Sequence, residues 1–290
     1  MNMLKNQWQA LTLPFNVEWH EALQQQHYAA QLLALTGKHL IPQEADDSNT
    51  NARYLAETEM LAGNKLTNGL RLGLKLTSLE LQLLDSGDQP QQTLPLAGLT
   101  FDEAFETMKK LLQKSGVDTA ALVNQLHFEI PDHALAHSAR FAVSNPQYFK
   151  ENARVRHDIE IVLREAVSGF SEAAPVRVWP HHFDTGTFIP LATNAKGGVT
   201  KSIGLGWAIP DTMIDEPYFY LSFWSEDDGK ISNDFTPLPA GAWMMPGWNG
   251  AVLRHSEILQ KQSAASQHET TALFFKRGIE FLTGYLNQGK

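Results

Sequence analysis

The chain has 290 residues, of which 43% are hydrophobic and 19% charged, a composition typical of a globular protein. Its net charge of −9 argues against non-specific binding to nucleic acid or to anionic membranes. It has no cysteine, which excludes disulfides, thiolate catalysis and cysteine-ligated zinc or iron–sulfur sites.

The sequence shows no pattern typical of a signal peptide or of a membrane span. The stretch from Met1 to Leu13 has no apolar run of the kind found in signal peptides. No apolar run elsewhere is long enough to predict a membrane span. We therefore predict a cytoplasmic protein that has neither a membrane nor a nucleic acid as partner.

The N-terminal part of the chain predicts one helix and one hairpin. Apolar residues recur with helical period from Asn16 to Leu35, and Gly37 follows as a candidate C-cap. Leucines then alternate with polar residues from Leu70 to Leu83, which predicts two strands with one buried face. Residues 53–61 are compatible with either a helix or a strand, and residues 86–95 are predicted as a loop.

The middle of the chain predicts three further helices, one of them a short helix from Asp118 to about Gln125, and a strand. Thr100 and Glu103 form a capping-box pattern before a helix over residues 101–114. Alternation from Leu126 to Ile130 predicts a strand, and a long helix is expected from Asn145 to about Ser168.

After Pro175 the chain becomes rich in aromatic and β-branched residues. Short runs at residues 176–189, 202–208, 218–224 and 242–245 are bounded by Gly, Pro, Asp and Asn, which is typical of an antiparallel meander. A last helix is predicted over residues 266–286. Because helices and strands come in runs, we predict an α+β fold: a mostly antiparallel sheet covered by the N-terminal, middle and C-terminal helices, forming a single domain over residues 1–290.

The stretch W-P-H-H-F-D, from Trp179 to Asp184, concentrates the most groups capable of chemistry. If residues 176–183 form a strand, His182 and Asp184 share one face, while Trp179 and His181 share the other. Pro180 has no N–H to donate, so an edge or bulged strand is expected here.

The pair His182 and Asp184 permits three interpretations. With His255 as a third ligand, it would form a two-histidine, one-carboxylate site for non-haem iron. Alternatively, His182 would act as a general acid or base that Asp184 orients, making these the candidate catalytic residues. In the third interpretation the histidines pack beside aromatic rings and have only a structural role.

Candidate ligand-binding residues surround this pair in the predicted layout. Tyr218, Tyr220 and Trp224 share one face of a strand. Their aromatic rings, each with a hydroxyl or N–H group, are suited to line a pocket. Glu216 precedes them, and the P-D-H segment supplies Asp132 and His133. Trp179, His181, His133, Glu216, Tyr218, Tyr220 and Trp224 are the predicted ligand contacts. A buried aromatic cluster or a solvated carboxylate explains the same pattern equally well.

The chain resembles a family of uncharacterised bacterial proteins that is defined only as a domain of unknown function. The resemblance rests on W-P-H-H-F-D, on E-P-Y-F-Y (Glu216–Tyr220), on His27–Lys38 and on F-E-I-P-D-H (Phe128–His133). In that family Phe183 and Asp184 correspond to a recurrent pair, whereas the two preceding positions vary. The resemblance implies one folded unit and no particular activity.

The leading functional hypothesis is a small-molecule-binding protein, with enzymatic activity left open, whose pocket is lined by His182, Asp184 and aromatic residues. The first alternative is a non-haem metal-dependent oxygenase using His182, Asp184 and His255. The second is a non-enzymatic structural or interaction protein. The sequence assigns no cofactor, metal, substrate or oligomeric state.

Overall fold

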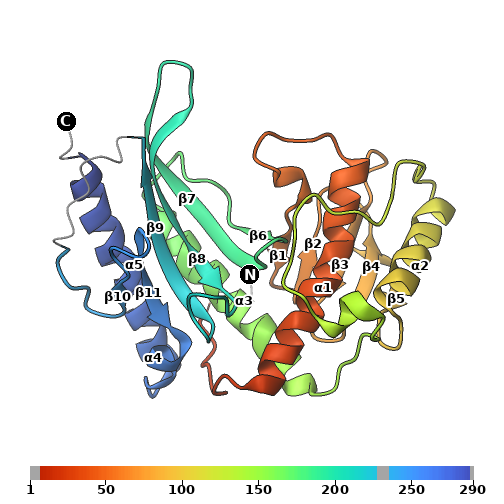
Figure 1. Ribbon diagram of the computed structural model, residues 1–290, viewed down its shortest axis with the longest axis horizontal. Coiled ribbons are helices and arrows are strands. Elements are labelled where there is room, and N and C mark those ends of the chain that lie inside the picture. The colour runs from red at the N-terminus through yellow and green to blue at the C-terminus, as the bar shows by residue number, and fades with distance from the viewer. Residues whose placement is uncertain (1–6, 227–234, 288–290) are drawn as a thin grey trace. The chain divides into compact units, whose positions relative to one another are not determined.

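The computed structural model describes residues 7–226 and 235–287 and confirms the predicted α+β class, with two antiparallel sheets (Figure 1). The chain divides into two compact units. The N-terminal unit comprises Asn16–His157 and Arg177–Phe183, and the C-terminal unit comprises Met1–Phe15, Asp158–Val176 and Asp184–Lys290. A single domain over residues 1–290 stays a prediction.

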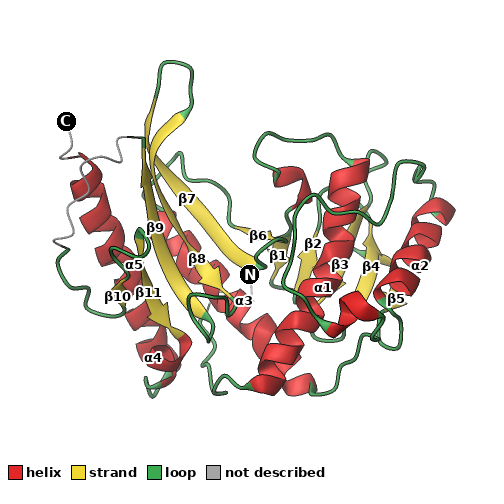
Figure 2. Ribbon diagram, viewed as in Figure 1, coloured by secondary structure: helices red, strands yellow, loops and turns green. Residues whose placement is uncertain are grey.

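The N-terminal unit contains a sheet with the strand order β1-β2-β3-β4-β5 (Figure 2). The predicted leucine hairpin is confirmed, because Leu74 pairs with Leu81 and both are buried. Residues 53–61, which the sequence left open, contribute to a further hairpin. The strands are β1 (Arg53–Leu55), β2 (Met60–Ala62), β3 (Arg71–Lys75), β4 (Glu80–Leu84) and β5 (Pro90–Pro95).

Strand β5 corrects the prediction of a loop over residues 86–95. Its residues 91–93 are exposed, so the stretch carries no apolar alternation that would reveal a strand. It is held by backbone pairing with β4 at the edge of the sheet, where Pro90 and Pro95 at its two ends are tolerated.

Helix α1 (Val17–Leu40) packs against β3. Its N-cap is Asn16, whose side chain accepts a hydrogen bond from Trp19 N at 2.9 Å. The helix continues past Gly37, so the predicted C-cap is wrong. Gly37 instead lets the short 3₁₀ helix η2 (Ser48–Thr50) approach, because a Cβ there would overlap the Asn49 carbonyl.

Helix α2 (Phe101–Lys114) has the predicted bounds and capping box: Glu103 N donates to Thr100 Oγ1, and Thr100 N donates to the Glu103 carboxylate. The predicted short helix from Asp118 to about Gln125 and the predicted strand at residues 126–130 are both wrong. Both segments are irregular and pair with no strand in the part of the chain that the structure describes, and the 3₁₀ helix η3 (Ala134–His137) follows them.

Helix α3 (Pro146–Val167) matches the predicted long helix, and the boundary between the units falls within it, after His157. The strands of the C-terminal unit run in the order β10-β11-β9-β8-β7. Their bounds are β7 (Asp184–Thr193), β8 (Val199–Ala208), β9 (Tyr218–Ser225), β10 (Ala242–Trp243) and β11 (Gly250–Arg254).

The helices α4 (His255–Leu259) and α5 (Ala264–Asn287) follow the last strand. Helix α5, close to its predicted bounds, covers one face of the C-terminal sheet: Phe275 meets Phe219 at 6.3 Å, and Gly278 lies directly on Leu221. No helix in the described ranges is long and apolar enough to cross a bilayer.

Candidate functional site

The W-P-H-H-F-D stretch forms a turn. Strand β6 covers only Arg177–Trp179, and Pro180–Phe183 turn before β7 begins at Asp184. Phe183 has φ +54°, the left-handed conformation, which no strand residue adopts. The predicted strand over residues 176–183 is therefore wrong, and its alternation of faces does not apply to His181 or His182.

Two side chains of α1 hold this turn by its backbone. His27 Nε2 lies 2.8 Å from the Pro180 carbonyl, and Gln31 Nε2 donates to the same oxygen at 2.9 Å. Both side chains are fully buried. Burial lowers the pKa of His27 to about 4, with smaller lowering contributions from the charges of Arg156, His182 and His181, so the ring is neutral at pH 7.

The side chain of Phe183 anchors the turn from the other side. Its ring stacks on His27 with 5.2 Å between centroids, and the Arg156 guanidinium lies 4.1 Å from the ring centroid. Arg156 Nη2 also donates to the Phe183 carbonyl at 2.6 Å. All three side chains are buried, so Phe183 is a structural anchor of the N-terminal unit.

The two histidines of the turn lie outside this anchor. His182 is exposed, and its ring centroid is 4.4 Å from that of His181. His181 contacts Trp179 and Phe128 edge-on, at 6.4 and 5.8 Å. These contacts match the structural interpretation, in which histidines pack beside aromatic rings.

Asp184 and Tyr220, both predicted site residues, are brought together in the C-terminal unit. Tyr220 Oη donates to Asp184 Oδ2 at 2.7 Å across β7, β8 and β9. The tyrosine ring reaches that far because it lies over Gly206, where a Cβ would stand 2.5 Å from Tyr220 Oη. Burial raises the pKa of Tyr220, and the charge of Asp184 raises it further, so the phenol stays protonated at pH 7.

The variant Tyr220→Phe is expected to lower the free energy of unfolding by about 1.5–3 kcal/mol, since a hydrogen bond to a charged group is lost. A double-mutant cycle with Asp184→Asn in urea denaturation measures the coupling. Because the folded-state pKa of Tyr220 is raised, its contribution is complete below about pH 10 and is lost as the pH rises further. Purely additive effects of the two changes would contradict the pairing.

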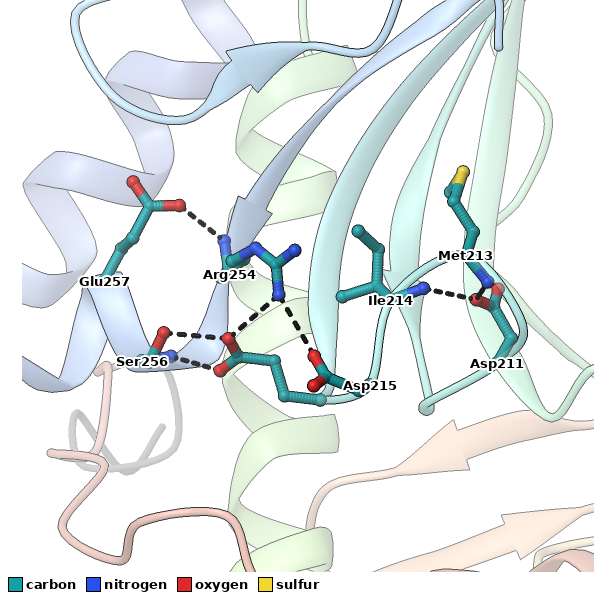
Figure 3. Close-up of polar contacts among 8 residues, drawn as sticks. Asp211, Met213, Ile214, Asp215, Arg254, Ser256 and Glu257 are labelled. Carbon is teal, nitrogen blue, oxygen red and sulfur yellow. Dashed lines mark hydrogen bonds and ion pairs between the residues drawn. The ribbon is translucent and has the colours of Figure 1, made fainter. Parts of the chain in front are cut away.

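Two other aromatic candidates have different environments. Tyr218 is buried and donates to Asp211 Oδ2 at 2.6 Å, and burial together with this bond raises its pKa. Asp211 also accepts from the backbone N–H groups of Met213 and Ile214, which closes the loop before β9 (Figure 3). Trp224, by contrast, is 46% exposed near the end of β9.

Glu216 and His255 are engaged within the fold. The Glu216 carboxylate accepts from Ser256 N at 2.8 Å and from Ser256 Oγ at 2.9 Å, and it pairs with Arg254, which also bonds Asp215 (Figure 3). It thus caps the start of α4. His255 is 1% exposed, its Nε2 lies 3.0 Å from the Leu13 carbonyl, and burial lowers its pKa.

The described residues contain no group of three or more His, Cys, Asp or Glu side chains arranged to hold a metal ion. The oxygenase hypothesis built on His182, Asp184 and His255 therefore draws no support from side-chain placement. Asp184 is engaged by Tyr220, and His255 is a core histidine.

A pocket of about 410 Å³ opens in the N-terminal unit, at a place that the predicted site did not include. Tyr28 and Gln31 of α1 line it together with the first residues of α2 and the irregular segment after residue 123. The lining is Tyr28, Gln31, Thr100, Phe101, Asp102, Asn124, Leu126, Glu129, Ile130, Asp132, Leu135, Ala136 and Ser138.

The predicted candidate His133 stands beside this pocket rather than in its lining. Its Nε2 lies 3.0 Å from Glu21 Oε2, and its Nδ1 accepts from Leu135 N at 3.2 Å, which starts η3. Its neighbour Asp132 does line the pocket. The P-D-H segment was thus the signal in the sequence that could have pointed here, whereas Tyr28 and Phe101 carry only helical spacing.

The charged side chains of the pocket all have the same sign. Asp102, Glu129 and Asp132 line it, and no lysine or arginine does. Burial raises the pKa of the Tyr28 phenol, and the charge of Asp132 raises it further. Asp102 accepts from Asn124 at 2.8 Å, and Asp132 pairs with the exposed His137 at 2.7 Å.

Aromatic and amide groups complete the pocket. The rings of Tyr28 and Phe101 meet edge-to-face with centroids 6.4 Å apart. Gln31 is fully buried, and its Oε1 has no hydrogen-bond partner among the described residues. The pocket therefore offers acceptors and aromatic rings to a ligand, with a net negative charge.

Comparisons of the chain with protein-family models, with curated proteins and with solved structures found no match.

Proposed function

We propose that the protein binds a small molecule carrying a protonated amine, in the pocket between Tyr28, Phe101 and Asp132. The observation that carries this proposal is the purely anionic charge of a pocket of about 410 Å³, a size common among ligand sites. The proposal keeps the hypothesis of a small-molecule-binding protein but moves its pocket away from His182 and Asp184, which are not in this lining.

The chemistry of the lining selects the ligand class. An ammonium group supplies only hydrogen-bond donors, and the carboxylates of Asp102, Glu129 and Asp132 supply acceptors. An ammonium is also attracted to the faces of aromatic rings, here those of Tyr28 and Phe101. An anionic ligand would meet three carboxylates with no basic group in the lining to offset them.

Isothermal titration calorimetry of the full chain with phenethylamine, phenethyl alcohol and phenylacetate tests the proposal. These probes share a ring and a linker and differ in charge. The amine is expected to bind about tenfold tighter than the alcohol, the acid most weakly, and added salt to weaken the amine alone, since the attraction is electrostatic. Equal affinity for amine and alcohol would overturn the proposal.

Removing one pocket charge provides the matched comparison. Glu129→Gln is expected to weaken amine binding about fivefold, roughly 1 kcal/mol, without changing stability, because Glu129 is exposed and makes no ion pair among the described residues. Glu106→Gln removes an equal charge from an exposed position of α2 outside the pocket. If both variants weaken binding equally, the effect comes from net charge and the site is wrongly placed.

A further inference from the structure

A second pocket, of about 530 Å³, lies in the C-terminal unit between the end of α3 and helix α5. Its lining residues on α3 and just after it recur at intervals of three or four, as do those on α5 from Ala272 to Thr283. These are the facing sides of the two helices. Small residues at Ala166, Gly169 and Ala272 leave the space open between them.

The wall of this pocket is mostly apolar. Val162 and Ile279 are buried within it, and the lining also includes Phe170. Along α5 the lining extends over eleven residue steps, from position 272 to 283, a length of about 16 Å at the helical rise. The pocket thus fits an elongated apolar group.

One charge at the pocket is available to a ligand. Of the two lining carboxylates, Glu165 is hydrogen-bonded to His268 at 2.7 Å and Glu280 forms an ion pair with Arg277 at 2.8 Å. Lys276, also in the lining, has no ion-pair partner in the ranges that the structure describes. The ammonium group of Lys276 is therefore the charged group at this apolar pocket that a ligand could pair with.

We propose that this pocket binds an amphipathic molecule with a saturated hydrocarbon chain and a carboxylate head, the chain lying between α3 and α5 and the head paired with Lys276. The site shares no residue with the amine pocket of the N-terminal unit. Either proposal can fail without the other.

Isothermal titration calorimetry of the full-length protein with octanoate, decanoate and dodecanoate tests whether the pocket binds a hydrocarbon chain. Each pair of added methylenes is expected to tighten binding roughly tenfold until the pocket is filled. Decanol should bind more weakly than decanoate, and decylamine more weakly still. No dependence on chain length would overturn the proposal, as would concentration-dependent self-association that covers this face with a second copy.

Variants at Lys276 test the head group. Lys276→Gln is expected to weaken decanoate binding about fivefold while leaving decanol binding unchanged, and Lys276→Arg should retain the preference for the acid. Lys261→Gln removes an equal charge from an exposed position of the same unit that is not in the lining. Equal losses in Lys276→Gln and Lys261→Gln would overturn the assignment.

A variant that fills the pocket tests its location. Ala272→Phe places a ring in the lining at a half-buried position and should abolish decanoate binding with the melting temperature largely retained. Should this variant unfold, Ala166→Leu from the α3 side serves the same purpose. Unchanged decanoate binding in a folded variant with a filled pocket would show that the hydrocarbon chain binds elsewhere.

Discussion

Replacing Phe183 with alanine is expected to lower the free energy of unfolding by about 3–5 kcal/mol, the largest effect expected of any change in the W-P-H-H-F-D stretch. The ring is fully buried between His27 and Arg156, so truncation leaves a cavity and removes both ring contacts. Urea denaturation followed by circular dichroism at neutral pH measures the loss.

Two further variants identify the source of that effect. Phe183→Leu keeps most of the volume and is expected to cost only about 1–2 kcal/mol, from the lost stacking and cation–π contacts. Phe188→Ala removes the same side chain from a position that is 40% exposed, where about 0.5 kcal/mol is expected. A loss in Phe183→Ala no larger than in Phe188→Ala would contradict the anchoring role.

Acid is expected to destabilise the protein through His27. Burial lowers the folded-state pKa of this ring to about 4, whereas the unfolded chain has the ordinary value of about 6.5. Between these values the unfolded chain binds a proton that the folded protein excludes. The contribution of His27 is therefore complete above about pH 6.5 and falls by about 2 kcal/mol by pH 5.

The control for this prediction is His27→Gln, which cannot titrate. His20 and His255 also have lowered pKa values, so the wild-type protein has several acid-sensitive groups and only the difference between the two proteins isolates His27. The fall in unfolding free energy from about pH 7.5 to pH 5 should be about 2 kcal/mol smaller in the variant. A nuclear magnetic resonance titration of His27 with a midpoint near 6.5 would contradict the prediction.

The elements whose signals are local could be predicted from the sequence alone. Helix α2 was predicted to the residue because its capping box, Thr100 with Glu103, lies within one turn of the helix that it starts. The β3–β4 hairpin followed from leucine alternation, which is visible within a dozen residues. The α+β class followed from the order of such elements.

The elements that depend on distant partners could not be predicted from local patterns. Strand β5 is held by pairing with β4 and has no apolar pattern of its own. Gly37 does not end α1 but allows the close approach of η2. The alternation at residues 126–130 was real, yet no neighbouring strand pairs with it in the described part of the chain. The pairing of strands and the close approach of distant backbone segments produce little recognisable pattern in a single sequence.

The residues of the candidate site also differ in how much of their structure could be predicted from the sequence. The sequence identified Asp184 and Tyr220, whose hydrogen bond depends on a tyrosine lying over Gly206. It could not show that Phe183 takes a left-handed conformation held by His27 and Arg156, because that turn is imposed by α1 and α3. Packing between distant segments, which local pattern does not encode, decided that Phe183 anchors this turn and that the pockets form away from the predicted site residues.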